Sequence, residues 1–581
     1  MALPGTSADH QDRSVTPSDL PTILEQLTAG AARWAAIDPR SRAEIARRTA
    51  CATVAVARAW ADAAVEVKQA PGNGPSRAEE IATGPMGTAR LCLLTARSLL
   101  DIDRSGTPGT ASPPRVLHPG RRSVAGTPAP LIGLDVLPAR GPSGTLYDPL
   151  IHGGLRATIR CHDPGGPAAF LKSWQHEADQ RPRGGGVSLV LGAGNVTGLG
   201  PADVLCQVFE HGRAALLKLH PLQSSLETVF TVALAPLIEA GLVAILSGGA
   251  DVARSAIAAP QLTHVHVTGG RATYEAILFG GPRPSGPAPQ PRLTQSISCE
   301  LGNVTPWFIL PGRYSTAELA FQADQLAASI INNTSFNCIA TKVIVTCRSW
   351  EQRQAFLGLV QRRLASLPPR PGWYPGAAAV WSEATGHASP ADGTLPWSVV
   401  CGVDPARDGR LLEREWFVPV VAEVPLDAGT LAEFCSRALG LSHRLPGSLA
   451  ASVTIPSGLP ETARLHAEQL VDHLAFGVVA VNTWSALAYS LGNVPWGGFP
   501  GATMLEPKSG IGFVHDPLLL PLVHNSVIRA PLWSALRPPW FAWHRSGTRL
   551  AQGVVDLYGR CAAGQNCLGI LLRMFPEVLR G

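Results

Sequence analysis

The sequence predicts an α/β fold in which helices cover both faces of a parallel sheet. Four short apolar runs lie between residues 187 and 270, and the chain between successive runs is long enough for one helix each. Continuous apolar strands of this kind are typical of a sheet that is buried on both faces. The four runs occupy residues 187–191, 214–219, 242–246 and 265–268.

Glycines follow three of these runs, at Gly192-Ala193-Gly194, Gly248-Gly249 and Gly269-Gly270. In such sheets the crossovers are right-handed, and ligands bind at the carboxyl ends of the strands. The arrangement therefore predicts a nucleotide-binding domain. The first glycine pair resembles a GxGxxG turn only loosely, and a tight turn between strand and helix explains it equally well.

Length and composition limit the function classes. The 581 residues are too many for one core, so we expect two or more lobes. A hydrophobic fraction of 45% excludes disorder of the whole chain. The 48 basic and 43 acidic residues give a net charge of only +5, and they are scattered along the sequence. Binding to nucleic acid through bulk positive charge is therefore excluded.

The 11 cysteines form no CxxC pair and no Cys/His cluster at zinc spacing. Such a dispersed, odd set indicates reduced thiols rather than a disulfide framework or a metal site. The amino terminus lacks the basic start and the apolar run of a secretory signal. No stretch of about 20 uninterrupted apolar residues is present, as a spanning helix would need. We expect a cytoplasmic protein with no metal and no membrane partner.

Two residues stand out as candidates for chemistry. Cys338 follows the polar run 332–335 and precedes a strand-like run, and a thiol at such a junction can be reactive. An inert buried cysteine is the alternative. Glu300 lies among apolar residues at a strand end, where desolvation would raise its pKa and suit a general base. A structural ion pair is the alternative there.

These residues belong to an ordered set of matches through which the chain, over roughly residues 145–515, resembles the aldehyde dehydrogenase superfamily. The segment VSLVLGAGN resembles the strand that ends in the family's catalytic Asn, which implies that role for Asn195. Lys218, 23 residues later in LLKLHP, matches the lysine that binds the adenine ribose. VHVTGG is similar to the family's Phe-Thr-Gly-Ser turn, which implies dinucleotide contacts for Thr268, Gly269 and Gly270.

The second half of the set carries the implied reaction. CELGNVTPWFI resembles the Glu-Leu-Gly-Gly motif and implies that Glu300 is the general base. NCIATKV, with Cys338 lying 38 residues beyond Glu300, resembles the nucleophile segment. EREWFVPVV resembles the Glu-x-Phe-Gly-Pro-Val motif, which implies a nicotinamide-ribose contact for Glu415 and ring packing for Phe417. PWGGFPG is similar to the family's Pro-Phe-Gly-Gly turn.

Four positions depart from the family pattern. Asn303 replaces the second glycine of the base motif, Val418 the glycine of the Glu-x-Phe-Gly-Pro motif, and Gly270 the frequent serine of the turn. Pro221 stands three residues after Lys218, where the family has an acid that accepts hydrogen bonds from the ribose 2′-OH. Without that acid a 2′-phosphate is not repelled, so the resemblance implies NAD or NADP as cofactor.

The resemblance implies oxidation of a small-molecule aldehyde to a carboxylic acid through a thiohemiacetal and a thioester on Cys338. Two other functions remain open. A CoA-acylating aldehyde dehydrogenase would release the acyl group to a thiol, but such enzymes generally lack a carboxylate at the Glu300 position. A dinucleotide-binding scaffold protein that has lost catalysis is favoured by the departures at Asn303, Val418 and Gly270, but it gives no reason to retain Asn195, Glu300 and Cys338.

The sequence pattern and the resemblance together divide the chain. Helical spacing runs from Leu20 to Leu100 with breaks at Asp38-Pro39 and near residues 72–75, and further helices are expected near 316–331 and from about Thr548. The expected parts are a mobile tail (1–20), an N-terminal helical part (21–144) with a Gly/Pro-rich linker (101–130), an oligomerisation hairpin (145–164), a Rossmann-like dinucleotide-binding domain (165–297), an α/β catalytic domain (298–481), and a C-terminal segment and extension (482–581). The hairpin implies a homodimer or homotetramer, which light scattering showing only monomer would overturn.

Overall fold

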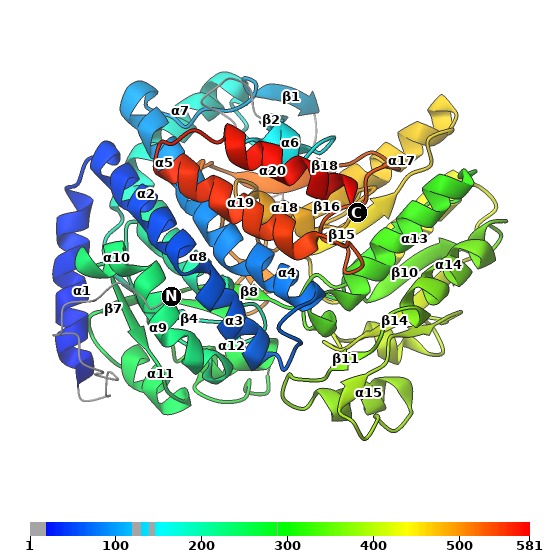
Figure 1. The fold of residues 1–581 in the computed structure, drawn as a ribbon, viewed down its shortest axis with the longest axis horizontal. Coiled ribbons are helices and arrows are strands. Elements are labelled where there is room, and N and C mark those ends of the chain that lie inside the picture. Colours follow the sequence, from blue (N-terminus) through cyan, green and yellow to red (C-terminus); the bar gives the residue numbers. More distant parts are fainter. Residues whose placement is uncertain (1–18, 119–128, 139–145, 287–288) are drawn as a thin grey trace.

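The computed structural model describes residues 19–118, 129–138, 146–286 and 289–581. Its described residues form two large sheets with helices packed on them, one of six strands and one of ten (Figure 1). A third sheet consists of the short strands β11 (Arg370–Pro371) and β12 (Thr394–Leu395). The predicted α/β fold with parallel sheets is confirmed.

The six-stranded sheet contains the four predicted strands in the order β17-β8-β7-β4-β5-β6. All neighbours pair in parallel except β17 with β8. The chain adds β5 and β6 on one side of β4 and then β7 and β8 on the other, so the strand order reverses between β4 and β7. A crevice at such a reversal is where α/β sheets bind ligands. The strands are β4 (Val187–Leu191), β5 (Ala214–Lys218), β6 (Val243–Leu246), β7 (Leu262–Gly269), β8 (Ser296–Leu301) and β17 (Gly510–Ile511).

Helices cover both faces of this sheet because successive strand residues point to opposite sides. Leu189 and Leu216 pack on one face against α1, α11 and α12. Val190 and Leu217 pack on the other against α2, α3, α5, α8 and α9. The bounds of these and the neighbouring helices are α1 (Leu20–Ala35), α2 (Pro39–Ala55), α3 (Ala57–Val67), α4 (Pro75–Ile81), α5 (Gly87–Ser105), α7 (Gly166–Gln180), α8 (Leu199–Leu205), α9 (Glu227–Ala233), α10 (Ala235–Glu239), α11 (Ala250–Ile257) and α12 (Arg271–Phe279). Of these, α7 packs instead in the core of the ten-stranded sheet.

The N-terminal helices break where the sequence predicts. The Asp38 side chain accepts a hydrogen bond from the backbone N–H of Ser41 at 2.9 Å and so caps α2. Gly74 and Pro75 mark the start of α4, since proline is favoured in the first turn of a helix. Residues 82–86 form a π-helical turn between α4 and α5.

The ten-stranded sheet has the order β1-β2-β3-β18-β16-β15-β9-β10-β14-β13. Its strands from β18 to β13 pair in parallel, whereas β1, β2 and β3 add antiparallel at one edge. The strands are β1 (Arg115–His118), β2 (Leu131–Leu137), β3 (Arg156–His162), β9 (Pro306–Ile309), β10 (Val343–Cys347), β13 (Ser398–Val400), β14 (Val420–Leu426), β15 (Ala450–Thr454), β16 (Val478–Val481) and β18 (Val523–Arg529).

The predicted helices of the second half are present. The helix expected near 316–331 is α13 (Thr316–Ile331), which begins with a capping box between Ser315 and Glu318. The helix expected from about Thr548 is α19 (Gly547–Ala562), which packs against α2, α4 and α5. The others are α14 (Arg353–Ala365), α15 (Ala377–Thr385), α16 (Leu431–Ser442), α17 (Glu461–His473), α18 (Ala486–Leu491) and α20 (Leu568–Leu579).

The prediction of a two-stranded hairpin over residues 145–164 is wrong, because the described part of this range contains only one strand. From residue 146 onward this range holds a short helix, α6 (Asp148–Ile151), and one strand, β3. β3 pairs with β2, which precedes the range, and with β18 near the carboxyl terminus. The antiparallel partner of β3 is therefore β2, an apolar run that lies before residue 145, and not a second strand within 145–164. The homodimer or homotetramer stays a prediction.

Three other expected boundaries fall differently in the structure. The division at 297/298 cuts β8, which belongs wholly to the six-stranded sheet. The segment after 481 supplies β18 to one large sheet and β17 to the other, because the chain returns through both. The linker at 101–130 contains the end of α5 and β1, while its residues 119–128 lie outside the described part, as do residues 1–18 of the expected tail. Within the described residues, no helix is both long and apolar enough to cross a membrane.

Candidate active site

The predicted catalytic residues come from three segments that meet beside the strand reversal. Asn195 lies in the loop after β4, and Glu300 lies near the carboxyl end of β8. Cys338 lies in the turn between α13 and β10. The Cys338 Sγ is 3.7 Å from the Glu300 Oε1, so thiol and carboxylate are in contact. The structure thus places in contact two residues that the sequence assigned to one site, and their catalytic roles stay a prediction.

The turn that carries Cys338 has an unusual backbone. Asn333, Thr334 and Ser335 all have positive φ angles, of 51°, 54° and 66°. Left-handed conformations are costly for residues other than glycine and persist only where surrounding contacts hold them. Here all three residues are buried. The turn that presents the thiol is therefore held in place by its environment.

Asn195 is joined to this turn by side-chain amides. Its Nδ2 donates to the Phe336 carbonyl at 3.1 Å. The Asn333 Nδ2 donates to the same carbonyl at 2.8 Å and to the Asn195 carbonyl at 2.9 Å. An amide nitrogen carries two hydrogens, so one N–H of Asn195 remains for another acceptor. These bonds fix the distance between the Asn195 loop and the turn that leads to Cys338.

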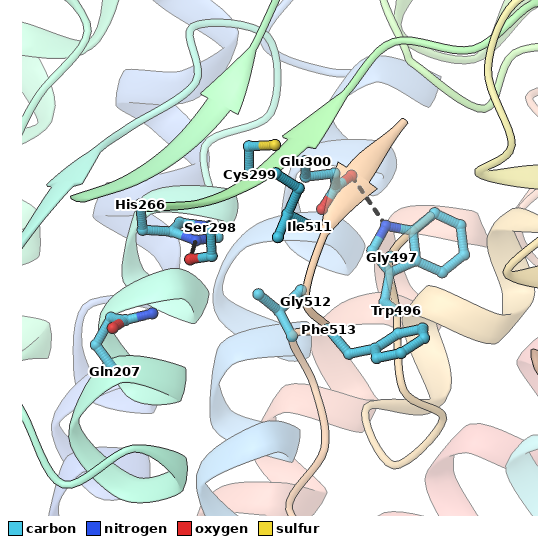
Figure 2. Close-up of a pocket in the computed structure, with 11 residues that line it drawn as sticks. Gln207, His266, Ser298, Cys299, Glu300, Trp496, Gly497, Ile511, Gly512 and Phe513 are labelled. Carbon is cyan, nitrogen blue, oxygen red and sulfur yellow. Dashed lines mark hydrogen bonds between the residues drawn. The ribbon is translucent and has the colours of Figure 1, made fainter. Parts of the chain in front are cut away.

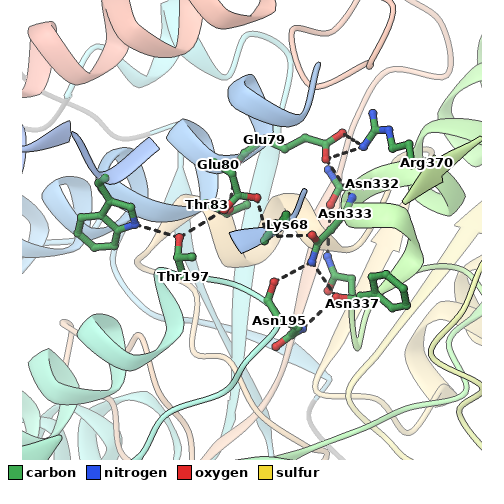
Figure 3. A network of polar contacts seen from close by, with 12 residues as sticks. Lys68, Glu79, Glu80, Thr83, Asn195, Thr197, Asn332, Asn333, Asn337 and Arg370 are labelled. Carbon is green, nitrogen blue, oxygen red and sulfur yellow. Dashed lines mark hydrogen bonds and ion pairs between the residues drawn. The ribbon is translucent and has the colours of Figure 1, made fainter. Parts of the chain in front are cut away.

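A buried ion pair from the N-terminal helices orients the Asn333 amide (Figure 3). The Lys68 Nζ donates to the Asn333 Oδ1 at 2.8 Å and pairs with the Glu80 Oε1 at 2.5 Å. The neighbouring Glu79 accepts from the Asn333 backbone N–H at 3.0 Å and pairs with Arg370 at 2.9 Å. The sequence alone does not indicate this network, because Lys68 and Asn333 are 265 residues apart and no local pattern links them.

The Glu300 carboxylate is enclosed. Its Oε1 accepts a hydrogen bond from the Trp496 indole at 2.9 Å (Figure 2). Burial raises the pKa of Glu300 to about 7, and the bond from Trp496 opposes this rise. Trp496 lies in the PWGGFPG segment, which the sequence singled out without assigning this contact. A carboxyl group with a pKa of about 7 can both take and release a proton near neutral pH.

The environment of the half-buried Cys338 favours the protonated thiol over the thiolate. Burial raises the pKa of Cys338 well above its usual range, and the negative charges of Glu300 and Glu415 add to the rise. The thiol is therefore protonated, with Glu300 as the nearest acceptor of its proton. This arrangement favours transfer of the proton to Glu300 as the sulfur reacts.

Glu415 precedes β14 in the chain, and its carboxylate lies against Gly302 of the base motif. An added Cβ at Gly302 would lie 1.9 Å from the Glu415 Oε2, so only glycine allows this contact. The Asn303 backbone N–H donates to Glu415, and burial raises the pKa of Glu415 to about 7 against the opposing charge of Lys342. The Glu415 Oε1 has no hydrogen-bond partner among the described residues.

Lys342 is a buried cation that the sequence analysis did not single out. Its Nζ donates to the Ser335 hydroxyl at 2.8 Å, to the Ser335 carbonyl at 3.2 Å and to the Val418 carbonyl at 2.8 Å. Burial lowers the pKa of Lys342 to about 7, and Glu415 opposes this change. Lys342 thus ties the Cys338 turn to the Glu415 segment.

Two departures from the family pattern have structural roles. The Asn303 Nδ2 donates to the Thr305 hydroxyl at 3.0 Å and to the Ala450 carbonyl at 2.8 Å, which joins the base motif to β15. Val418 packs in the core around the ten-stranded sheet, and its carbonyl accepts a hydrogen bond from Lys342. Both substitutions therefore serve packing beside the site.

Phe417 has a positive φ of 51° and belongs to an aromatic cluster. Its ring centroid lies 5.2 Å from that of Tyr374 and 6.0 Å from that of Phe336. Phe336 in turn contacts Trp373. The cluster forms an apolar wall beside the Cys338 turn, with the Phe417 ring half-buried.

The predicted dinucleotide residues lie at the carboxyl edge of the six-stranded sheet. Lys218 ends β5, and burial lowers its pKa while Asp251 opposes the change. Gly269 and Gly270 lead into α12, and a Cβ at either would meet no atom within 4 Å. The Thr268 hydroxyl instead donates to the Asp203 Oδ2 at 2.8 Å and so points into the protein. The glycines leave open space at a helix N-terminus, which suits a phosphate.

The described residues include one group whose side chains could bind a metal, Cys206, Glu210 and His211, whose ligand atoms lie within 4.8 Å of one another. The sequence alone does not indicate this group, because a π-helical turn brings these residues together. The Cys206 Sγ donates to the Glu210 Oε2 at 3.1 Å. Burial lowers the pKa of the half-buried His211, and the charges of Arg181 and Arg213 add to this effect and would repel a cation as well.

No family model matches the chain, and no curated protein is similar to it in sequence. Solved structures are similar to it over most of their length. An NADP-dependent glyceraldehyde-3-phosphate dehydrogenase from Bacillus halodurans C-125 is 16% identical, with a TM-score of 0.58 over 89% of this chain and 92% of that chain. The chain has the aldehyde dehydrogenase fold.

Two further aldehyde dehydrogenase structures give the same result. Betaine aldehyde dehydrogenase from Staphylococcus aureus is 15% identical, with a TM-score of 0.58 over 88% of this chain and 90% of that chain. An indole-3-acetaldehyde dehydrogenase is 16% identical, with a TM-score of 0.58 over 89% of this chain and 90% of that chain. At such low identity the similarity establishes the fold, so the reaction must be argued from the site.

Substitution of Lys68 by Met should lower the free energy of unfolding by about 3–5 kcal/mol, because it leaves the Glu80 carboxylate buried without its partner. Urea denaturation measures this loss. The double variant Lys68→Met/Glu80→Leu should recover most of it, since both charges are then gone. As a control, Arg48→Met removes an exposed pair with Glu239 and should cost less than about 1 kcal/mol. Equal losses for the two single variants would contradict this account.

Proposed function

We propose that the chain oxidises an aldehyde to a carboxylic acid with NAD or NADP as the electron acceptor. The observation that carries the proposal is the contact between the Cys338 thiol and the Glu300 carboxylate, 3.7 Å apart, with the Asn195 amide bound to the same turn. A nucleophile, a base and a neutral hydrogen-bond donor are the groups that acyl transfer through a covalent intermediate requires.

In the first step the Cys338 sulfur attacks the aldehyde carbonyl while its proton passes to Glu300. The developing oxyanion accepts hydrogen bonds from the free N–H of Asn195 and from the backbone N–H of Cys338. Loss of one such donor costs about 3–4 kcal/mol of transition-state stabilisation in well-studied cases. The buried amide network holds Asn195 in place before the substrate arrives, so little reorganisation is needed.

The residues present fit a dinucleotide. Lys218, the open space beside Gly269 and Gly270, and the unpartnered Glu415 Oε1 would hold its ribose and phosphate groups. The bound cofactor would supply the acceptor for the hydride that converts the thiohemiacetal on Cys338 to a thioester. Pro221 in place of an acid leaves space for either NAD or NADP.

Before the last step Glu300 releases to solvent the proton that it received from Cys338. It then takes a proton from a water molecule, whose oxygen attacks the thioester carbon. The C–S bond breaks, and the departing acid leaves its proton on the Cys338 sulfur, so the product is the carboxylate and the thiol is regenerated. Over one turnover the aldehyde, water and the oxidised cofactor yield the carboxylate, the reduced cofactor and two protons. The presence of a carboxylate beside the thiol supports release to water rather than to CoA, and adding CoA should therefore yield no acyl-CoA product.

An aldehyde panel tests the proposal directly. Wild-type protein should reduce NAD or NADP in the presence of at least one aldehyde, as followed by absorbance at the wavelength of the reduced cofactor. Cys338→Ala should lose at least about 1000-fold of this activity, because the covalent route is removed. As a control, Cys435→Ala changes a cysteine on α16 outside the site and should retain activity. Full turnover by Cys338→Ala would refute the assignment.

The pH dependence of deacylation follows from the pKa of Glu300. Only the ionised carboxylate can take a proton from water, so steady-state turnover should rise as the pH increases through about 7. Glu300→Gln should abolish that rise and slow steady-state turnover by about 100-fold or more. The first burst of reduced cofactor should lose much less of its rate, because solvent can accept the Cys338 proton in place of Glu300. Rapid-mixing absorbance measures both phases. An equal loss of burst and steady state would show that Glu300 is not the deacylation base.

A further inference from the structure

Strands β7 and β8 carry a row of polar side chains on one face of the six-stranded sheet. The register places His264 opposite Ser296, His266 opposite Ser298, and Thr268 opposite Glu300. Strands buried in a parallel sheet are usually apolar, as they are on the opposite face of these two strands, where Val265, Val267, Ile297 and Cys299 pack in the core. The row, which we call the polar ladder, ends at the proposed general base.

Hydrogen bonds connect the outer members of the ladder. The His264 Nδ1 and the Ser296 Oγ are 2.7 Å apart, and the His264 Nε2 and the Ser298 Oγ are 2.8 Å apart. The same Ser298 hydroxyl lies 2.8 Å from the His266 Nδ1. Each imidazole nitrogen of His264 thus has a hydroxyl partner, and a hydroxyl can donate or accept. The chain of bonds is complete with either tautomer of His264.

The outer end of the ladder meets solvent, since Ser296 is exposed whereas His264 and His266 are buried. Burial lowers the pKa of His264 to about 3, and the charge of Arg213 adds to this effect. The ring therefore stays neutral at physiological pH. A neutral imidazole with a partner on both nitrogens can receive a proton on one and release the other.

A small cavity joins the inner end of the ladder to Glu300 (Figure 2). Its volume is about 10 Å³, and its polar lining includes Glu300, Ser298, His266 and Gln207. A volume of this size holds about one water molecule where polar partners are present. The Glu300 Oε1 is bound by Trp496, but the buried Oε2 has no hydrogen-bond partner among the described residues. One water in this cavity would connect that oxygen to Ser298.

We propose that the polar ladder conducts the proton that Glu300 takes from the hydrolytic water out to solvent. The inference rests on the proposed function and identifies relay residues for its last step. The Glu300 Oε2 releases its proton to the cavity water, which passes one to the Ser298 Oγ. The Ser298 hydroxyl proton moves to the His264 Nε2, the His264 Nδ1 proton moves to Ser296, and the Ser296 hydroxyl proton leaves to bulk water. Each group gains and loses one proton, so only Glu300 changes charge.

His266 has a supporting place in this path. Its Nε2 lies 3.4 Å from the Asp203 Oδ1 and 3.3 Å from the Thr268 hydroxyl, which itself donates to Asp203. These contacts fix the ring so that its Nδ1 meets the Ser298 hydroxyl at the cavity. We assign His266 as a positioning residue for Ser298 and the cavity water.

The test uses p-nitrophenyl acetate with the full chain, because this activated ester acylates Cys338 without a dinucleotide. Nitrophenol appears in a burst on acylation and then at a rate set by deacylation. Ser298→Ala should leave the burst rate unchanged and slow deacylation about 10-fold. Ser298→Thr retains a hydroxyl and should restore the rate to within about twofold of wild type. As a matched control, Thr263→Ala removes a hydroxyl from the same strand pair, off the ladder, and should have no effect.

Because removal of the Ser298 hydroxyl should make proton release from Glu300 rate-limiting, Ser298→Ala should also show a larger solvent deuterium isotope effect on deacylation, whereas a loss of packing alone would not increase it. Deacylation at the wild-type rate in Ser298→Ala would overturn the proposal, as would an equal loss in Thr263→Ala or ester hydrolysis that does not depend on Cys338 and Glu300. The proposed function fails separately: if no aldehyde reduces NAD or NADP while ester hydrolysis responds to Ser298→Ala, the ladder stands and the oxidation does not.

Discussion

The hydrogen bonds of the Asn333 side chain are the constraint on which the site depends. Through one amide group the protein joins the loop after β4, the turn that carries Cys338 and a lysine from the N-terminal helices. The positive φ angles of residues 333–335 would be unfavourable in a free chain, and these contacts stabilise them. The spacing between an amide, a thiol and a carboxylate from distant segments is thereby fixed before any substrate binds. Positioning of this kind lowers the reorganisation needed during a reaction.

Several charged groups around the site are buried, and burial shifts their pKa values toward neutrality. Glu300, Glu415 and Lys342 all reach about 7, two from below and one from above. Desolvation of each group costs free energy, and the neighbouring charges and hydrogen bonds offset part of it. The functional consequence is that groups which are permanently charged in water can exchange protons here at physiological pH. The polar ladder on β7 and β8 gives one of them, Glu300, a connection to solvent.

Much of the fold was predictable because its signals are local. The apolar runs of β4 to β7 and the glycines after them predict the parallel sheet, and the resemblance to the aldehyde dehydrogenase superfamily implies that Glu300 and Cys338 belong to one site. The strand β2, an apolar run just after a Gly/Pro-rich segment, was missed, and with it the true partner of β3. Lys68, Lys342 and the His264–Ser298 contacts were also missed. Their partners come from other parts of the chain, and a single buried lysine or histidine leaves no pattern in the sequence.

The central claim is that the Cys338 thiol and the Glu300 carboxylate share one electrostatic environment. The most direct measurement is the alkylation rate of Cys338 by iodoacetamide as a function of pH, followed by mass spectrometry of the peptide that contains it. Because the negative charge of Glu300 contributes to the raised pKa of the thiol, the Glu300→Gln variant should show a midpoint at lower pH than the wild type. Identical pH profiles for the two proteins would show that the thiol and the carboxylate are not coupled and would contradict the account.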